Sequence, residues 1–196
     1  MYKETAIILS ILFFLCTSVT RNSVADDGYF ISLYGGQVSD TPFHAIIRGN
    51  VDYKDYYLIA LSFGKELFVY KDSISVEMEG QVVKHINGTE HWEANPVLTL
   101  RWLPFPWDDK IDTSFAWGNG ISFASEKPEF EMEESSKDDR TSQVLYYFMV
   151  EIEFEFQKIE NWGVFSRIHH RSSVFGLIDG LQTGSNYLTI GVRYRF

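Results

Sequence analysis

The residues of this chain best suited to chemistry are His170 and Ser172, in the segment Ile168-His169-His170-Arg171-Ser172-Ser173. In a β-strand, residues two apart share a face, and their Cβ atoms lie roughly 6 to 7 Å apart. An imidazole and a serine hydroxyl can meet across that gap, with the imidazole acting as the base. The pair therefore predicts a serine nucleophile, provided that this segment is a strand.

The C-terminal segment, residues 187–196, indicates what kind of strand is present. Its side chains alternate strictly, with Arg193 and Arg195 on one face. The other face is apolar and consists of Leu188, Ile190, Val192, Tyr194 and Phe196. Inward arginines are costly in a soluble sandwich but ordinary in the polar interior of a small membrane barrel. The terminal Phe196 resembles the signal read by the bacterial barrel-assembly machinery, which we expect as a partner.

Other segments fit the same template of alternating residues bounded by turns. They cover residues 28–36, 57–67, 73–82, 92–102, 111–124, 143–156 and 162–173, which gives eight strands with the C-terminal one. An even number of strands closes a barrel and leaves no edge. Short connections alternate with long ones, such as the loops after Ser39 and Ser125. The sequence therefore predicts an all-β protein, an eight-stranded antiparallel transmembrane β-barrel of the bacterial outer membrane.

The inward faces of these strands are expected to be charged. They would carry Glu77, Glu79, Glu93, Asp112, Glu151, Glu153, Glu155, Arg101, Arg167, Arg193 and Arg195. Eight strands leave room for side chains but not for an open channel, which disfavours a solute pore. We expect a packed network in which arginines neutralise carboxylates. No sequence spacing supports the alternative, a carboxylate pair acting as general acid and base.

The N-terminus indicates export. The apolar run from Ala6 to Val19 follows Lys3 and has fourteen residues, which is short for a membrane span. Ser23-Val24-Ala25 fits a small-x-small cleavage site. We expect residues 1–25 to be a cleaved signal peptide and residues 26–196 to form a single barrel domain.

Cysteine content and charge exclude several classes of function. Cys16 is the only cysteine, so the exported chain would have no disulfide and no thiolate site. Cys16 also allows a lipoprotein, but Phe14 and Leu15 stand where a lipobox needs small residues. The net charge of −10 argues against nucleic acid as a partner. Aromatic residues make up 16% of the chain, as expected where they form girdles at two membrane interfaces.

The apolar residues of the strand predicted at 162–173 indicate which of its side chains point outward. If Trp162 and Val164 point outward, so do His170 and Ser172, at the external end of the strand and level with the outer leaflet. The alternative is that they are merely polar residues in the headgroup zone. Adjacent His169 and His170 point apart, and the remaining histidines, His44, His85 and His91, lie in or near loops without ligand spacing. We therefore expect no metal and no organic cofactor.

His170-Arg171-Ser172 resembles the His-x-Ser motif of the PagL-type lipid A 3-O-deacylases, which are eight-stranded outer-membrane barrels. The resemblance is specific over residues 162–196 and architectural elsewhere. It implies a serine esterase that removes an ester-linked acyl chain from lipid A, with Ser172 as nucleophile and His170 as general base. Lipopolysaccharide of the outer leaflet would then be the partner.

The chain departs from the family at two positions. Ser173 follows the serine, where the family usually has Asn, and no carboxylate occurs near Gly184 and Ser185, where the family has the glutamate that orients the histidine. Asp179 is the acid in that loop that could take its place. The alternative function is a non-catalytic outer-membrane barrel that acts through its external loops, in adhesion or membrane stabilisation.

Overall fold

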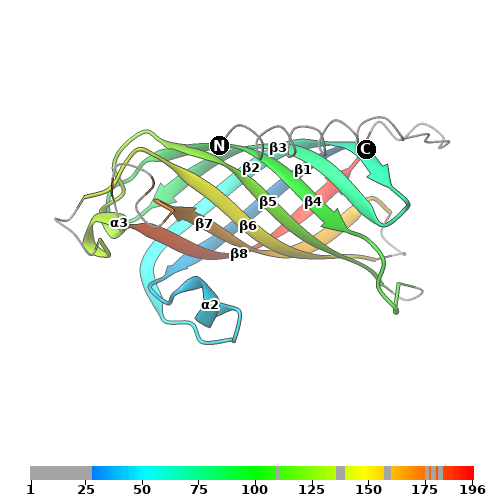
Figure 1. The fold of residues 1–196 in the computed structure, drawn as a ribbon, viewed down its shortest axis with the longest axis horizontal. Coiled ribbons are helices and arrows are strands. Elements are labelled where there is room, and N and C mark those ends of the chain that lie inside the picture. Colours follow the sequence, from blue (N-terminus) through cyan, green and yellow to red (C-terminus); the bar gives the residue numbers. More distant parts are fainter. Residues whose placement is uncertain are drawn as a thin grey trace, which may run out of the picture.

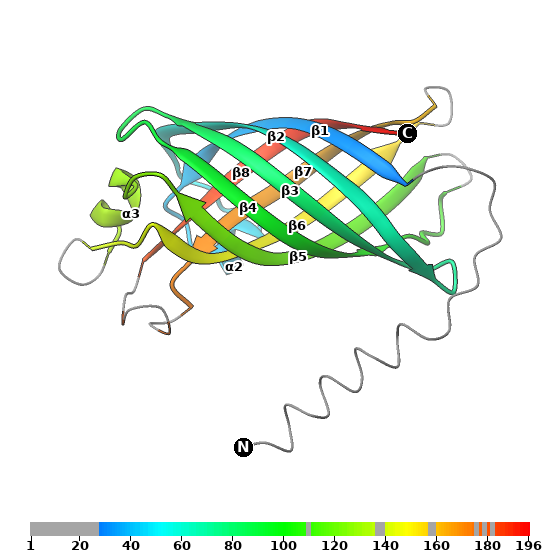
Figure 2. The ribbon, with the colours of Figure 1, turned by 90° about the horizontal axis from the view of Figure 1, so that it is seen from above.

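The protein is a closed barrel of eight antiparallel strands in which each strand pairs with the next and β1 pairs with β8 (Figures 1 and 2). The computed structural model describes residues 28–108, 111–135, 140–156, 160–174, 177, 180 and 183–196. The strands are β1 (Tyr29–Ser39), β2 (Tyr53–Tyr70), β3 (Ile74–Ile86), β4 (Trp92–Trp102), β5 (Asp112–Ala124), β6 (Val144–Glu155), β7 (Trp162–Ser172) and β8 (Gly184–Arg195). The predicted fold class is confirmed. The predicted signal peptide lies outside the described residues.

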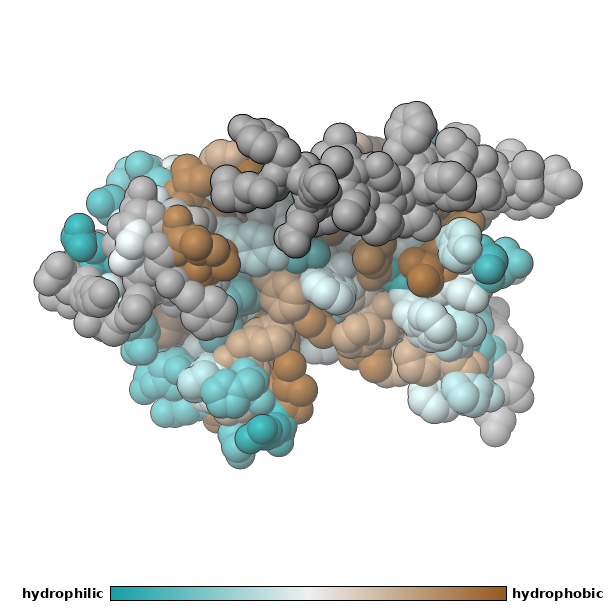
Figure 3. Space-filling view, in the orientation of Figure 1, coloured by the Kyte–Doolittle hydropathy of each residue, from teal (hydrophilic) through white to brown (hydrophobic). Residues whose placement is uncertain are grey.

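Alternation of side chains builds the barrel wall. Along β4, exposed and buried residues alternate strictly from Trp92 to Trp102, and both of these tryptophans are exposed. Large apolar side chains therefore cover the outside of the barrel, and Leu61 and Trp117 are about half exposed. Figure 3 shows apolar side chains gathered along the middle of the barrel wall and hydrophilic ones at its two ends.

The two ends of the barrel differ. The connections at 40–52, 87–91, 125–143 and 173–183 join strands at one end, here named the loop end, and those at 71–73, 103–111 and 156–161 join strands at the other, the turn end. Two loops expected to be irregular contain short helices, α2 (Phe43–Ile46) and α3 (Glu129–Glu133) (Figure 1). No helix in the described part of the chain has the length and apolar character to cross a membrane.

The barrel interior holds the predicted charge network. The single carboxylate of Glu151 accepts hydrogen bonds from three arginines, Arg101 at 2.7 Å, Arg167 at 2.8 Å and Arg193 at 2.9 Å. Further ion pairs join Arg101 to Glu77, Arg167 to Glu79, and Arg195 to Glu153 and Glu155. Paired in this way, the buried charges avoid the cost of isolated ions.

One predicted facing is wrong at the start of β5. Asp112, expected in the interior, is exposed, and Thr113, expected outside, is buried. The turn before β5 causes the change. Trp107 Nε1 donates to Thr113 Oγ1 at 2.8 Å, and the Thr113 amide donates to Asp108 at 3.0 Å.

Helix α3 anchors the connection between β5 and β6, where the sequence predicts a long loop after Ser125. Glu131 is buried, accepts hydrogen bonds from Thr141 at 2.7 Å and Ser185 at 3.0 Å, and pairs with Arg171 at 3.2 Å. Phe130 packs in the same apolar cluster as Tyr187. The connection is therefore part of the packed loop end.

Candidate active site at the loop end of β7

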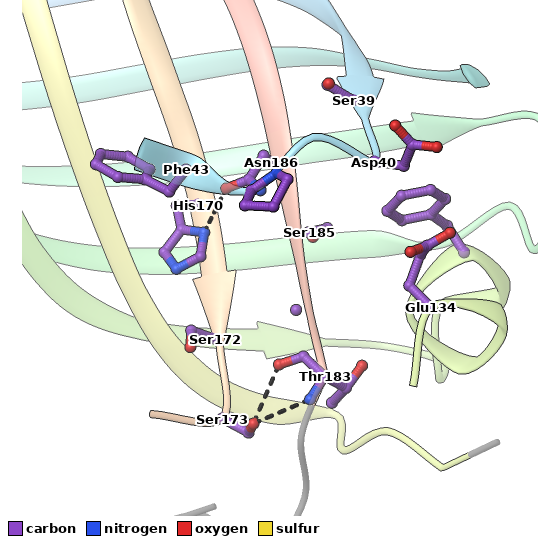
Figure 4. Close-up of a pocket in the computed structure, with 13 residues that line it drawn as sticks. Ser39, Asp40, Phe43, Glu134, His170, Ser172, Ser173, Thr183, Ser185 and Asn186 are labelled. Atoms are coloured by element: carbon purple, nitrogen blue, oxygen red, sulfur yellow. Dashed lines mark hydrogen bonds between the residues drawn. The ribbon is translucent and has the colours of Figure 1, made fainter. Parts of the chain in front are cut away.

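His170 and Ser172 lie on the outward face at the loop end of β7, as expected. Along β7, His169 and Arg171 are buried, whereas His170 and Ser172 are half-buried. In Figure 4, the His170 ring and Ser172 lie on the same side of the strand. The alternation that builds the wall thus places an imidazole and a hydroxyl together outside the barrel.

A cleft of about 500 Å³ contains both residues. Three parts of the chain that are distant in sequence form it: the end of β1 with the 40–52 connection that follows it, the α3 region, and the β7–β8 hairpin (Figure 4). Its lining includes the carboxylates Asp40 and Glu134, and no lysine or arginine among the described residues. Lys54 pairs with Asp40 at 2.8 Å, so one of the two carboxylates is neutralised.

Asn186 holds the His170 ring. The two residues pair across β7 and β8, and His170 Nδ1 lies 2.6 Å from Asn186 Oδ1. Asn186 Nδ2 donates to the Thr41 carbonyl at 3.1 Å, which directs the amide oxygen toward the ring. That oxygen only accepts, so Nδ1 carries the proton and Nε2 keeps a lone pair. His170 is therefore in the tautomer that a general base requires.

Two aromatic rings enclose the imidazole. Phe43 of α2 lies 5.6 Å from the His170 ring between centroids, and Phe148 of β6 lies 6.2 Å away. Phe43 and Phe148 also contact each other at 5.3 Å. This apolar wall limits the movement of the ring and shields it from water on one side.

Ser172 is held in a different direction. Its Oγ accepts a hydrogen bond from the Val174 amide at 3.0 Å, and in the described residues no hydrogen bond joins it to His170. Val174 has a φ of 52°, which turns the chain sharply after β7. A hydroxyl that accepts this bond still has its proton to donate, and a serine side chain has other staggered rotamers about Cα–Cβ.

Neither position 184 nor position 185 can hold an outward glutamate of the kind that the PagL-type motif has there. At Gly184, an added Cβ would lie 2.4 Å from the Arg171 carbonyl oxygen. Ser185 points inward to Glu131. Ser173, at the position where the PagL-type motif has Asn, both donates to and accepts from the Thr183 backbone at 3.1 Å. Asp179 lies outside the described residues.

Sequence reasoning missed Asn186, although a signal for it existed. In the β7–β8 register, Trp162 pairs with Tyr194, and the same register brings His170 opposite Asn186. Asn186 also belongs to the alternate residues of β8 whose side chains face outward. A search for an amide, rather than for a carboxylate alone, would have found it.

The chain matches no family model and no curated protein in sequence. Solved structures do match in three dimensions. One is the outer membrane enzyme PagL, with a TM-score of 0.58 at 11% identity, covering 85% of this chain and 99% of that chain. Another is Neisserial surface protein A (NspA), with a TM-score of 0.53 at 11% identity, covering 88% of this chain and all of that chain. The fold is that of outer-membrane barrels. At such identities the likeness concerns the fold alone, and the chemistry must be argued from the cleft.

Proposed function

We propose that this protein is a serine esterase of the bacterial outer membrane that removes an ester-linked acyl chain from lipid A. The observation that carries the proposal is the bond from His170 Nδ1 to Asn186 Oδ1, beside a serine in the same cleft. Residues 1–25 are a signal peptide that is cleaved on export, and the barrel-assembly machinery inserts the chain by recognising Phe196.

The reaction uses the two side chains in sequence. Ser172 Oγ attacks the ester carbonyl while His170 Nε2 takes its proton, and the histidine returns this proton to the leaving sugar oxygen. The acyl group is then bonded to Ser172. Water, deprotonated by the same nitrogen, attacks that ester, the histidine returns the proton to Ser172 Oγ, and a fatty acid is released. Residues of the chain supply every proton transfer, so the reaction requires no metal or organic cofactor.

The exposed apolar side chains around the outside of the barrel, here named the apolar band, support a lipid substrate. If the band spans the bilayer with the loop end outside, the cleft opens on the barrel wall near the outer leaflet, where lipopolysaccharide lies. An acyl chain could then enter from the side. The lining carboxylate of Glu134, which has no cationic partner among the described residues of the cleft lining, would repel lipid A phosphates, so we expect the cleft to take the acyl ester and leave the phosphates outside.

Asn186 takes the orienting role in this proposal. A neutral amide fixes the tautomer but stabilises the imidazolium less than a carboxylate does. We therefore expect slower turnover than in an enzyme with a glutamate at this place. If Asp179 is instead the orienting acid, its removal must lower activity, and removal of Asn186 must leave activity unchanged.

The test is a mass spectrum of lipid A from a host that expresses the protein in its outer membrane. We expect loss of one hydroxyacyl chain with the natural sequence and intact lipid A with Ser172→Ala or His170→Ala. Ser166→Ala is the matched control, because Ser166 also faces outward on β7 but lies outside the cleft. Intact lipid A with the natural sequence, in cells where the barrel is folded, would reject this substrate.

Two observations favour a second candidate, a non-catalytic barrel that acts through its loops. Among the described residues, Ser172 Oγ is bonded to Val174 and not to His170, and residues 129–133 of the acidic 125–143 connection form a helix. In that case, replacing Ser172 and His170 would change nothing, whereas replacing exposed residues of this connection would change adhesion or membrane integrity.

A further inference from the structure

A second group of histidines lies inside the barrel at the loop end, apart from the cleft. His85 at the end of β3, His91 just before β4 and Glu93 in β4 belong to one hairpin, and all three are buried. One ligand atom of each lies within 4.8 Å of the others. The spacing of these residues in the sequence does not indicate a metal site. It is the turn at Asn87 and Gly88 that brings the two histidines together.

The first observation concerns a ring nitrogen of His91. Its Nδ1 lies 2.7 Å from the Thr89 carbonyl, which can only accept, so Nδ1 donates and Nε2 keeps a lone pair. In the part of the chain that the structure describes, this buried Nε2 has no hydrogen-bond partner. Histidines that bind metals usually donate their other N–H to a carbonyl or a carboxylate in this way.

The second observation concerns the charge of Glu93. The other buried carboxylates at 77, 79, 131, 151 and 153 each pair with an arginine. Glu93 contacts His85 Nε2 at 2.7 Å, His169 Nε2 at 3.1 Å and the Ser122 hydroxyl at 2.8 Å. Among the described residues, no arginine or lysine forms an ion pair with Glu93, and a buried carboxylate without a cationic partner is costly.

We propose that His85, His91 and Glu93 form a binding site for a divalent metal ion of the zinc class. Two imidazoles and one carboxylate are a ligand set that zinc uses, with solvent as the fourth ligand. Tyr187 contacts His85 Nδ1 at 3.2 Å and Thr89 holds His91, so both rings have outer partners. The two rings stack at 4.1 Å between centroids, and one of them must tilt to share the ion.

The ion would stabilise the loop end of the barrel. Glu93 already connects the β3–β4 hairpin to His169 of β7, the residue that precedes His170 on the opposite face. An ion bound to Glu93 would fix this connection. It lies inside the wall, so it takes no part in the reaction proposed above, and the two proposals can fail independently.

The test measures zinc binding by the full chain, extracted in detergent from the outer membrane of its host and cleared of metal with a chelator. We expect one equivalent of Zn²⁺ per chain and a higher unfolding temperature with zinc than with Mg²⁺, which prefers oxygen ligands. Co²⁺ in its place is expected to give the visible absorption of a tetrahedral site.

His91→Gln is the discriminating variant, because glutamine can still donate to the Thr89 carbonyl. We expect its affinity for zinc to fall by about 100-fold or more, since even loss of an outer partner typically costs 10- to 100-fold. His44→Gln is the matched control, because His44 is exposed in the 40–52 connection and should leave affinity unchanged. Absence of stoichiometric zinc in the folded natural protein, or equal binding by a folded His91→Gln variant, would overturn the proposal and leave an imidazolium to compensate Glu93.

Discussion

At the scale of single residues, the candidate site depends on an amide that fixes a tautomer. Thr41 directs Asn186, and Asn186 directs His170. An asparagine free to flip could instead offer its NH₂ group to the ring and hold the wrong tautomer, which is severely damaging in a serine esterase. The bond to Thr41 prevents this flip, so the amide can replace a carboxylate in orientation, though not in charge.

This role of Asn186 is open to direct test. Asn186→Ala should lower the rate of ester cleavage by about 10- to 100-fold, because general-base catalysis contributes 10²- to 10⁴-fold and only its orientation is impaired. Asn186→Asp should retain activity, because the carboxylate still accepts from Nδ1–H. Turnover of a soluble ester by the purified barrel measures both. Asn50→Ala, in the exposed 40–52 connection, is the control, and equal rates for Asn186→Ala and the natural protein would exclude the role.

At the scale of elements, the helices of the loop end position the cleft. Phe43 of α2 packs against His170, and α3 is anchored by Glu131 to Ser185 of β8 and Arg171 of β7. Neither helix has a side-chain cap, and they are four and five residues long. Helices this short do not form alone in water, so tertiary contacts must hold them.

Removal of Glu131 should release α3. Glu131→Ala removes hydrogen bonds to a charged group worth about 1.5–3 kcal/mol each, so the open population of the 125–143 connection should rise at least about tenfold. Limited proteolysis of the folded barrel measures this opening as faster cleavage within the connection. Glu126→Ala, at an exposed position in the same connection, should be cut at the natural rate. Unchanged cleavage of Glu131→Ala would mean that other contacts hold α3.

The elements also show what the sequence could and could not predict. Strands were predictable because alternation repeats over many residues, and the outward facing of His170 and Ser172 followed from it. The helices and the buried state of Glu131 were not, because they depend on contacts between distant segments. Asn186 was missed because strand register is a pairing between segments, and His85 and His91 because a turn joins them.

At the scale of the whole molecule, the barrel is polar inside and apolar outside. Its stability therefore depends on a charge network whose members compensate one another. Glu151 is the central member, since three arginines bind it. Without this carboxylate, three buried guanidinium groups would share too few partners.

Glu151→Ala should destabilise the barrel by about 3–5 kcal/mol, the usual cost of leaving buried charge unpaired. The free energy of unfolding in urea, measured in lipid vesicles, gives this value. Glu160→Ala, at an exposed position between β6 and β7, should stay within about 0.5 kcal/mol of the natural protein. If Glu151→Ala has the same free energy of unfolding as the natural protein, the charge network does not stabilise the barrel and contributes at most to the specificity of the fold.

Activation of Ser172 as a nucleophile can be tested without knowing the substrate. The folded barrel is exposed to a fluorophosphonate, which reacts covalently with activated serines, and the modified peptide is located by mass spectrometry. We expect modification of Ser172 in the natural protein, its loss in His170→Ala, and no modification of Ser166. A folded natural protein whose Ser172 stays unmodified, or one modified equally without His170, would contradict this activation.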